Sequence, residues 1–499
     1  MRPESIAPGM LIRNEWIASA DRMFEVRNPA TGEPIAELPD ADEAAVDRAV
    51  RAAREALPEW WAMGGERRGR LLWKLAEAIE ARAGHIGELE ATDNGRPIRE
   101  TAAQANVVAR WYRWFGGIAD KIGGETIPVQ GPYLNYTRRV PVGVCAAITP
   151  WNHPMLIATK KVAPTLACGN TLVVKPSELA PLSVLELGRL AVEVGLPPGV
   201  LNIVTGQGAT GAALAAHPDV DRIDVTGSTR TGQAVATEAA KTLKRVGLEL
   251  GGKAPNLIFE DADVERAVRG ALFAAYIAQG QTCVAGSRVL VHRSLLDQVS
   301  ERMRTAVDAI RLGDPRDPAT QMGPVITPAA AERIAGFVER ARADGAEVLS
   351  DNRSIEDLQP PLDRAGFHPP TLIRTEDPKI EIACEEVFGP VTVIVPFEDE
   401  DEAVAIANDV PFGLGAGIWT EDVARAHRVA DRLRCGISWI NEYHRVDPAS
   451  PWGGFGLSGY GRENGWQAVE MFTEVKSTWV PLERSPMDWY ENVEPRRLS

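Results

Sequence analysis

The feature that most constrains the fold is an alternation of short apolar segments and helical segments that begins near residue 142. The apolar segments read VCAAITPW, TLVVKP, LNIVTG, RIDVTG and RVGLELGG, and helices are predicted between them near 155–167, 182–195, up to Ala216, and 230–241. Strands that are apolar along their whole length and separated by helices indicate a parallel sheet covered on both faces. Residues 142–251 are therefore predicted to form a doubly wound α/β unit.

A second series of the same kind follows, which predicts a second α/β domain over residues 252–455. Its apolar segments are APNLIF, SRVLVH, VTVIVPF, GAGIW and CGISWIN, with helices near 263–278, 295–311, 328–344, 401–407 and 421–433. Residues 41–121 have helical periodicity, so 1–121 is assigned with 142–251 to the first domain. Residues 122–141 and 470–484 have strand-like composition but belong to neither series. They are predicted to form a small added sheet whose free edges pair with another element or another subunit.

Charge, hydropathy and cysteine spacing exclude several classes of protein. The 54 Lys and Arg residues are scattered among 69 Asp and Glu residues, so no nucleic-acid footprint is expected. Glu4 and Asn14 interrupt the amino-terminal segment and no run of 18 apolar residues occurs, which predicts a cytoplasmic protein that does not bind membranes. The five cysteines are odd in number and form no CxxC pair, so neither a disulfide framework nor a metal site is predicted.

Three strand ends carry groups that could bind a nucleotide. The segment GQGATG (206–211) matches G-x-G-x-x-G between a strand and a helix, but Asp221 and Asp224 lie at the start and middle of the next strand rather than at its end, where the fingerprint has its acidic residue. In TGSTRTG (226–232), Ser228 could hold a phosphate or simply cap a helix. Lys175 and Glu178 end the strand TLVVKPSE, at the edge where open α/β sheets bind ligands.

Seven segments, taken in order, resemble the NAD(P)-dependent aldehyde dehydrogenase superfamily. They are TPWNHP, VVKPSE, TGSTRTG, LELGGK, GQTC, EEVFGP and PWGGFGLSGYGREN. The resemblance runs from about residue 20 to residue 482. It implies an NAD-binding domain (1–121 and 142–251), a catalytic domain (252–455) and oligomerisation strands (122–141 and 470–484). It also implies a homodimer or homotetramer.

The resemblance implies that Cys283 is the nucleophile, and its small neighbours keep the thiol reachable. A thiolate attacks an aldehyde carbon readily, and the oxyanion that forms needs fixed hydrogen-bond donors. By similarity these donors are the Cys283 backbone N–H and the side chain of Asn152. Glu249, in LELGGK, corresponds to the general base that activates water. Lys161 and Glu474 correspond to a pair near that base, either a proton relay or a structural ion pair.

NAD is the expected cofactor, and by the resemblance the residues that bind it lie along the strand ends and turns. Those with a specific role are Ile148 and Trp151 (nicotinamide), Lys175 and Glu178 (adenosine ribose), Ser228 (pyrophosphate), and Glu386 and Phe388 (nicotinamide ribose). The remaining candidates are Ser177, Gly208, Gly211, Val225, Gly227, Thr231, Leu250 and Gly251. Val225 stands where the family commonly has an aromatic residue, which alters part of the adenine pocket.

The substrate entrance is also assigned by resemblance, to Val107, Trp111, His153, Ile157, Lys160, Thr282, Val284, His444, Arg445 and Trp452. Lys160 stands where an aromatic residue is frequent, and His444 and Arg445 add polar groups. If these three converge on one channel, the aldehyde has an apolar body and a polar or anionic far end. If they are scattered surface charges, they carry no information on the substrate.

The predicted function is oxidation of an aldehyde to the carboxylic acid, with NAD preferred, through a thiohemiacetal and a thioester that water hydrolyses. The nearest rival is a coenzyme A-acylating semialdehyde dehydrogenase, which generally lacks the carboxylate of Glu249. A rival of another class is a catalytically idle protein that keeps the fold as a binding module.

Overall fold

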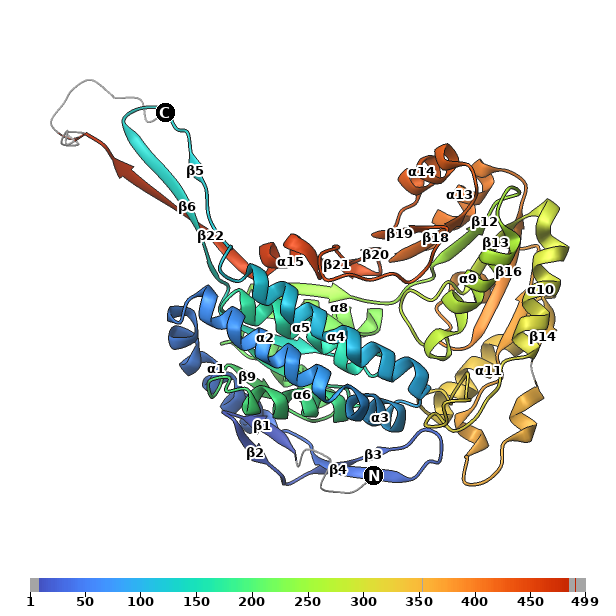
Figure 1. Ribbon diagram of the computed structural model, residues 1–499, viewed down its shortest axis with the longest axis horizontal. Coiled ribbons are helices and arrows are strands. Elements are labelled where there is room, and N and C mark those ends of the chain that lie inside the picture. The colour runs from blue at the N-terminus through green and yellow to red at the C-terminus, as the bar shows by residue number, and fades with distance from the viewer. Residues whose placement is uncertain (1–8, 352, 484–489, 491–499) are drawn as a thin grey trace.

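The computed structural model describes residues 9–351, 353–483 and 490, which form two lobes and a projecting arm (Figure 1). The first lobe contains an eight-stranded sheet with the order β2-β1-β9-β8-β7-β10-β11-β21. Its strands are β1 (Met10–Ile12), β2 (Glu15–Ile17), β7 (Val144–Ile148), β8 (Thr171–Lys175), β9 (Leu201–Ile203), β10 (Arg222–Thr226), β11 (Arg245–Glu249) and β21 (Gly459–Tyr460). The five central strands, β9 to β11 in this order, are parallel. This confirms the sheet predicted for residues 142–251.

Helices cover both faces of this sheet, as expected for a doubly wound fold. They are α1 (Glu43–Ala62), α2 (Gly65–Ala81), α3 (Ala83–Asp93), α4 (Ile98–Ile118), α5 (Pro154–Ala167), α6 (Leu182–Glu193), α7 (Gly208–Ala216) and α8 (Thr229–Ala240). Successive residues of β7 alternate between two cores. Cys145 and Ala147 pack with α2, α4, α5 and α6, whereas Val144 and Ala146 pack with α1, α7 and α8. Helix α5 is buried along nearly its whole length, which fixes the positions of the residues that it carries.

The second lobe contains a seven-stranded sheet with the order β14-β15-β16-β13-β12-β18-β19, parallel except for β14. Its strands are β12 (Pro255–Ile258), β13 (Arg288–His292), β14 (Glu347–Ser350), β15 (Thr371–Arg374), β16 (Val391–Phe397), β18 (Gly415–Trp419) and β19 (Ile437–Ile440). Its helices are α9 (Val264–Tyr276), α10 (Leu296–Asp308), α11 (Pro328–Ala343), α12 (Glu381–Cys384), α13 (Glu400–Asn408) and α14 (Val423–Arg432). The sheet confirms the second α/β series, although the sequence did not predict β14 and β15 because both are short and lie among turns.

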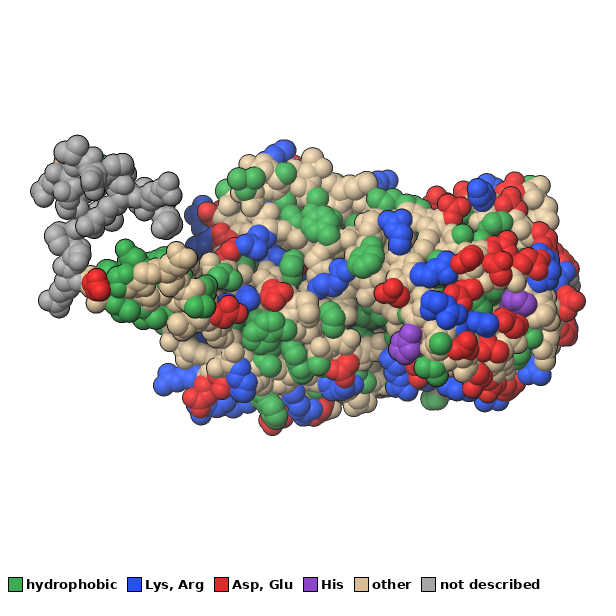
Figure 2. All heavy atoms as spheres, turned by 90° about the horizontal axis from the view of Figure 1, so that it is seen from above, with side chains coloured by type: hydrophobic (Ala, Val, Ile, Leu, Met, Phe, Trp, Pro, Cys, Tyr) green, Lys and Arg blue, Asp and Glu red, His purple; other side chains and the backbone are tan. Residues whose placement is uncertain are grey.

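The arm is a three-stranded antiparallel sheet of β5 (Thr126–Ile127), β6 (Tyr133–Pro141) and β22 (Thr473–Pro481). It confirms that the two leftover segments pair with each other. Hydrophobic side chains gather on the arm in Figure 2, whereas charged side chains crowd the second lobe. The exposed large apolar residues of the arm are Ile127, Tyr133, Leu134, Val475, Trp479 and Val480.

Short elements complete the described part of the chain. They are β3 (Met23–Arg27), β4 (Pro34–Pro39), β17 (Phe412–Gly413), β20 (Phe455–Gly456), α15 (Gly465–Met471) and the 3₁₀ segments η2 (Ile277–Gly280), η3 (Arg293–Leu295), η4 (Arg353–Asp357) and η5 (Arg364–Gly366). None of the helices in residues 9–351 and 353–483 combines the length and the apolar character needed to cross a bilayer. Near the carboxyl end, β21 returns to the first sheet and pairs with the end of β11, where Glu249 lies opposite Gly459.

Candidate active site

The turn between α9 and Cys283 holds the backbone in a conformation that most residues avoid. Ala278, Gln279 and Gly280 have φ values of 52°, 57° and 67°. Each non-glycine residue in this left-handed region costs on the order of 1 kcal/mol, so the surrounding structure must hold it there. The Glu100 carboxylate accepts a hydrogen bond from Ala278 N–H at 3.1 Å, and Gln279 Nε2 donates to the Gly95 and Pro324 carbonyls at 2.6 and 3.0 Å. These bonds fix the loop that ends at Cys283.

Two glycines of LELGGK allow the end of β11 to lie against this loop. A Cβ atom on Gly252 would come within 2.4 Å of the Cys283 carbonyl oxygen, and one on Gly251 within 2.3 Å of the Glu386 carboxylate. Because real Cβ contacts are never this short, position 252 requires glycine, and a side chain at 251 would displace the Glu386 carboxylate. The glycines therefore bring Glu249, Cys283 and Glu386 to one region between the lobes.

Asn152 lies beside the catalytic loop. Its Nδ2 donates to the Gln281 carbonyl at 2.8 Å, which is two residues before Cys283, and its Oδ1 has no hydrogen-bond partner. An amide nitrogen carries two hydrogens, so the second N–H stays available beside the thiol. Asn152 and Cys283 line the same cavity.

This cavity, of about 290 Å³, contains many of the residues predicted to bind the nucleotide. Its lining includes Trp151, Gly227, Ser228, Leu250, Gly251, Glu386 and Phe388 from that set, together with Pro150, Thr226 and Arg333. The Trp151 and Phe388 rings meet edge to face with centroids 5.5 Å apart. Arg333 was not predicted, because an arginine inside the amphipathic helix α11 has no sequence signal that separates it from its neighbours.

The polar groups of this cavity are already organised by the protein. Ser228 caps α8, and its Oγ accepts from Thr231 N–H at 3.2 Å. Glu386 Oε1 accepts from Gly252 N–H at 2.9 Å, and burial raises the pKa of this carboxyl to about 7. The cavity therefore offers a helix amino terminus at one position and a carboxylate at another.

The other predicted nucleotide residues lie at the ends of β7, β8 and β10 or at the start of α7. Lys175 Nζ is 3.1 Å from Glu178 Oε2, and a Cβ on Gly211 would contact both Ile148 and Lys175 at 3.6–3.8 Å. Ser177 lies on the loop that follows β8, and Gly208 is the first residue of α7. Val225 is fully buried in the apolar core, which corrects the expectation that its side chain faces the nucleotide.

Glu249 is buried at the end of β11, and its Oε2 has no hydrogen-bond partner. Burial raises the pKa of Glu249 well above its usual value, and the negative charge of Glu463 adds to this effect, while Lys161 and Lys160 oppose it. A carboxyl group with a raised pKa in a closed cavity is suited to general-base catalysis.

The carboxylate beside Lys161 is Glu463, so the prediction of Glu474 is wrong. Lys161 Nζ donates to Glu463 Oε1 in a buried ion pair, and Lys160 Nζ is 3.6 Å from Glu463 Oε2. Glu474 lies on the outer strand β22 instead, where its side chain is 41% exposed and pairs with Arg245. Glu463 belongs to the segment PWGGFGLSGYGREN, so the motif contained the signal, but its carboxylate was not assigned a role.

The Cys283 thiol lies at the junction of two cavities. Burial raises the pKa of this thiol to about 12, and the Lys160 ammonium is the first group that opposes the effect. The thiol is therefore protonated at neutral pH, and Glu249 is the carboxyl group in the adjoining cavity that could accept its proton.

The second cavity has a volume of about 40 Å³ and is lined on one side by Cys283 and Glu249. Seven residues predicted for the substrate entrance line it, namely His153, Ile157, Lys160, Thr282, Val284, His444 and Trp452. Leu156, Val446 and Glu463 also line it and were not predicted. Of the three residues expected to converge on one channel, Lys160 and His444 line this cavity and Arg445 does not.

Two predictions for the substrate entrance, Trp111 and Arg445, are wrong, and Val107 is not among the residues that line this cavity. Trp111 is fully buried and its indole N–H donates to Asn464 Oδ1 at 2.7 Å, while Val107 packs against the core of the first lobe. Arg445 is 81% exposed and pairs with Glu442. His444 has a left-handed backbone (φ 66°), which turns the chain so that its own ring faces the cavity and the next side chain faces solvent.

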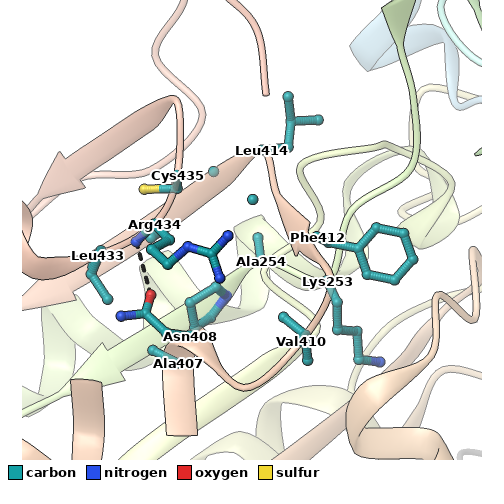
Figure 3. Close-up of a pocket in the computed structure, with 14 residues that line it drawn as sticks. Lys253, Ala254, Ala407, Asn408, Val410, Phe412, Leu414, Leu433, Arg434 and Cys435 are labelled. Carbon is teal, nitrogen blue, oxygen red and sulfur yellow. Dashed lines mark hydrogen bonds between the residues drawn. The ribbon is translucent and has the colours of Figure 1, made fainter. Parts of the chain in front are cut away.

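A smaller cavity behind the catalytic loop is separate from this site (Figure 3). It is lined by Lys253, Asn408, Arg434 and Cys435, and Arg434 N–H donates to Asn408 Oδ1 at 2.8 Å. Burial lowers the pKa of Lys253 to about 7. This cavity and the two active-site cavities have no lining residue in common.

Comparison with known proteins identifies relatives along nearly the whole chain. The profile of the "Aldehyde dehydrogenase family" matches residues 16–478. Betaine aldehyde dehydrogenase of Sinorhizobium fredii is 42% identical over 466 residues, which cover 93% of this chain and 95% of that protein. The crystal structure of PnpE from Pseudomonas sp. WBC-3 is 42% identical, with a TM-score of 0.93, and the match covers 98% of this chain and all of that one. The NAD⁺ complex of aldehyde dehydrogenase from Bacillus cereus is 39% identical, with a TM-score of 0.93 and coverage of 97% and 99%.

Proposed function

This chain belongs to the aldehyde dehydrogenase family, and from that premise we propose how its residues divide the chemistry. It is an NAD-dependent aldehyde dehydrogenase that acts through a cysteine. We propose that the product is the free carboxylic acid. The observation that carries this proposal is that Cys283 and Glu249 line one cavity, so a nucleophile and a base meet the same bound molecule.

Cys283 forms the bond to the aldehyde carbon. Glu249 takes the thiol proton, either directly or through water, because the raised pKa of the thiol prevents spontaneous ionisation near pH 7. Attack moves the carbonyl electron pair onto oxygen and gives a thiohemiacetal. Asn152 and the Cys283 backbone N–H donate to that oxygen, and donors fixed before the reaction stabilise developing charge most effectively.

The larger cavity fits NAD by its chemistry. The start of α8 at Ser228 suits a phosphate, and the Glu386 carboxylate suits ribose hydroxyls. Bound NAD supplies the acceptor for the hydride that leaves the thiohemiacetal carbon. Glu178, beside Lys175, accepts from a ribose 2′-hydroxyl and repels a 2′-phosphate, so we propose a preference for NAD over NADP.

Deacylation needs a water and a base on the substrate side of the thioester. Glu249 fills this role, and its retention favours water over coenzyme A as the acyl acceptor. Lys161 and Glu463 form the ion pair next to it, where they can stabilise the carboxylate or pass its proton onwards. Hydrolysis then releases the acid and restores the thiol.

We also propose that the arm joins subunits into a homodimer or homotetramer, which is supported by the exposed apolar side chains along β6 and β22. The sequence further predicts a cytoplasmic enzyme. The proposed domain limits are 1–121 with 142–251 for NAD binding, 252–455 for catalysis, and 122–141 with 470–484 for assembly.

A panel of aldehydes tests the proposal. NADH production is measured with the wild type and with Cys283→Ala, and the products are identified with and without coenzyme A. We expect NADH and the free acid from the wild type, and no NADH from Cys283→Ala although it still binds NAD. An acyl-coenzyme A product would favour the acylating rival, and no NADH from any aldehyde would favour the idle protein.

A further inference from the structure

Lys160 brings a buried positive charge into the substrate cavity. It lies on α5, is only 5% exposed, and lines the same cavity as Cys283 and Glu249. Its Nζ lies 3.8 Å from the centroid of the Trp452 ring, and a cation over an aromatic face is held by the ring's electron density. The ammonium is therefore fixed in direction, and its ion-pair partner is the Glu463 carboxylate.

That carboxylate, Glu463, is shared between two lysines. Lys161 binds Oε1 closely, and Lys160 is 3.6 Å from Oε2. Burial raises the pKa of Glu463, but Lys161 and Lys160 outweigh burial and hold it below its ordinary value, so Glu463 is ionised. One negative charge therefore faces two positive charges.

The cavity also contains two histidines and a second carboxyl group, Glu249. Burial and nearby cations, including Lys160, hold the pKa of His153 well below its usual value and that of His444 at about 4. Both rings are therefore neutral at pH 7. Burial raises the pKa of Glu249 well above its usual value, which favours its uncharged form. Lys160 is thus the cation that lines this cavity, and its carboxylate partner Glu463 is bound more closely by Lys161.

We propose that Lys160 makes this enzyme selective for aldehydes that carry a carboxylate or another anionic group, and that it disfavours cationic aldehydes. The inference rests on the proposed function of Cys283 and names the class of its substrate. A carboxylate that enters the cavity pairs with the ammonium in a setting of low dielectric constant, where such contacts are strong. Leu156, Ile157 and Val446 provide apolar walls for the part of the molecule between the aldehyde and the anionic group.

This inference separates the chain from relatives to which it is similar in sequence. A betaine aldehyde dehydrogenase is named for an aldehyde with a quaternary ammonium group, and one such protein is 42% identical to this chain. A buried ammonium and a quaternary ammonium in one cavity repel each other, and burial weakens the screening of their charges. High overall identity therefore does not carry that substrate over.

The test compares kcat/KM for three aldehydes: 4-oxobutanoate, its uncharged methyl ester, and betaine aldehyde. We expect the wild type to prefer 4-oxobutanoate over the ester by tenfold or more, and betaine aldehyde to be the poorest. Lys160→Met should abolish this preference, and Lys160→Arg should largely keep it. Arg445→Leu is the matched control, since it removes a neighbouring cation that lies outside the cavity, and it should leave the preference unchanged.

The ratio of kcat/KM for 4-oxobutanoate to that for the ester is the decisive readout. Lys160 also lowers the pKa of Cys283, but a change in the thiol affects both aldehydes equally and cancels in the ratio. A wild-type ratio near one, or a ratio that survives Lys160→Met, would overturn the inference while oxidation of the ester still supported the proposed function. Failure to oxidise any aldehyde would instead count against the proposed function.

Discussion

Glu463→Gln should destabilise the protein strongly, whereas Glu474→Gln should not. At an effective dielectric constant of 20, the Lys160–Glu463 pair alone, 3.6 Å apart, has an attraction of about 5 kcal/mol. The free energy of unfolding should fall by less than the summed attraction of Glu463 to both lysines, because the charges also lose hydration when they are buried. Breaking a buried pair costs roughly 3–5 kcal/mol. Glu474 pairs with Arg245 at the surface, where side chains 41% and 47% exposed make the pair worth about 0–1 kcal/mol.

The assay is urea denaturation of the wild type and both variants at one protein concentration, followed by tryptophan fluorescence. We expect a large shift of the midpoint for Glu463→Gln and almost none for Glu474→Gln. The double variant Lys161→Met/Glu463→Leu should recover much of the loss, because removing both partners leaves fewer buried charges unpaired. Equal effects of the two single variants would refute the assignment of Glu463 as the partner of Lys161.

Three further predictions concern catalysis and cofactor binding. Glu249→Gln should give a near-stoichiometric burst of NADH followed by slow turnover, since the thioester forms before water must be activated; mass spectrometry that finds no acylated enzyme would argue against this role. The affinity for NAD should rise between pH 6 and pH 8, because the Glu386 carboxyl has a pKa of about 7 and its ionised form accepts from ribose hydroxyls. Calorimetry should show that Glu386→Gln removes this pH dependence of NAD affinity. The same pH dependence in the variant as in the wild type would contradict the prediction. Glu178→Ala should raise kcat/KM for NADP relative to NAD, and equal cofactor use by the wild type would show that Glu178 does not select.

The sequence predicted the two large sheets because their strands are apolar along their whole length, and the motifs predicted the central groups Cys283, Asn152 and Glu249. Errors arose where neighbouring residues look alike. Glu463 and Glu474 are both glutamates near the carboxyl end, and only the return of the chain through β21 brings the first of them to Lys161. His444 and Arg445 are adjacent, and the left-handed backbone at His444 decides which one faces the cavity.

Other errors came from packing that no local pattern encodes. Trp111 lies on the helix assigned to the entrance, but its indole finds a partner in Asn464, 353 residues away, and is fully buried. Val225 replaces an aromatic residue, and the smaller side chain is enclosed by its own core. The short strands β1, β2, β14 and β15, which lie at or next to the edge of a sheet, have too few residues to show a periodicity.

The two active-site cavities have only Thr226 and Cys283 in common among their lining residues. The residues that line one cavity can therefore be changed while most of those that line the other are kept. A gene library that varies Leu156, Ile157, His444 and Val446 would explore new aldehydes without altering a residue that lines the nucleotide cavity. The same division gives natural selection a simple route to new metabolic roles, since the substrate range can diverge while the redox half of the enzyme is inherited unchanged.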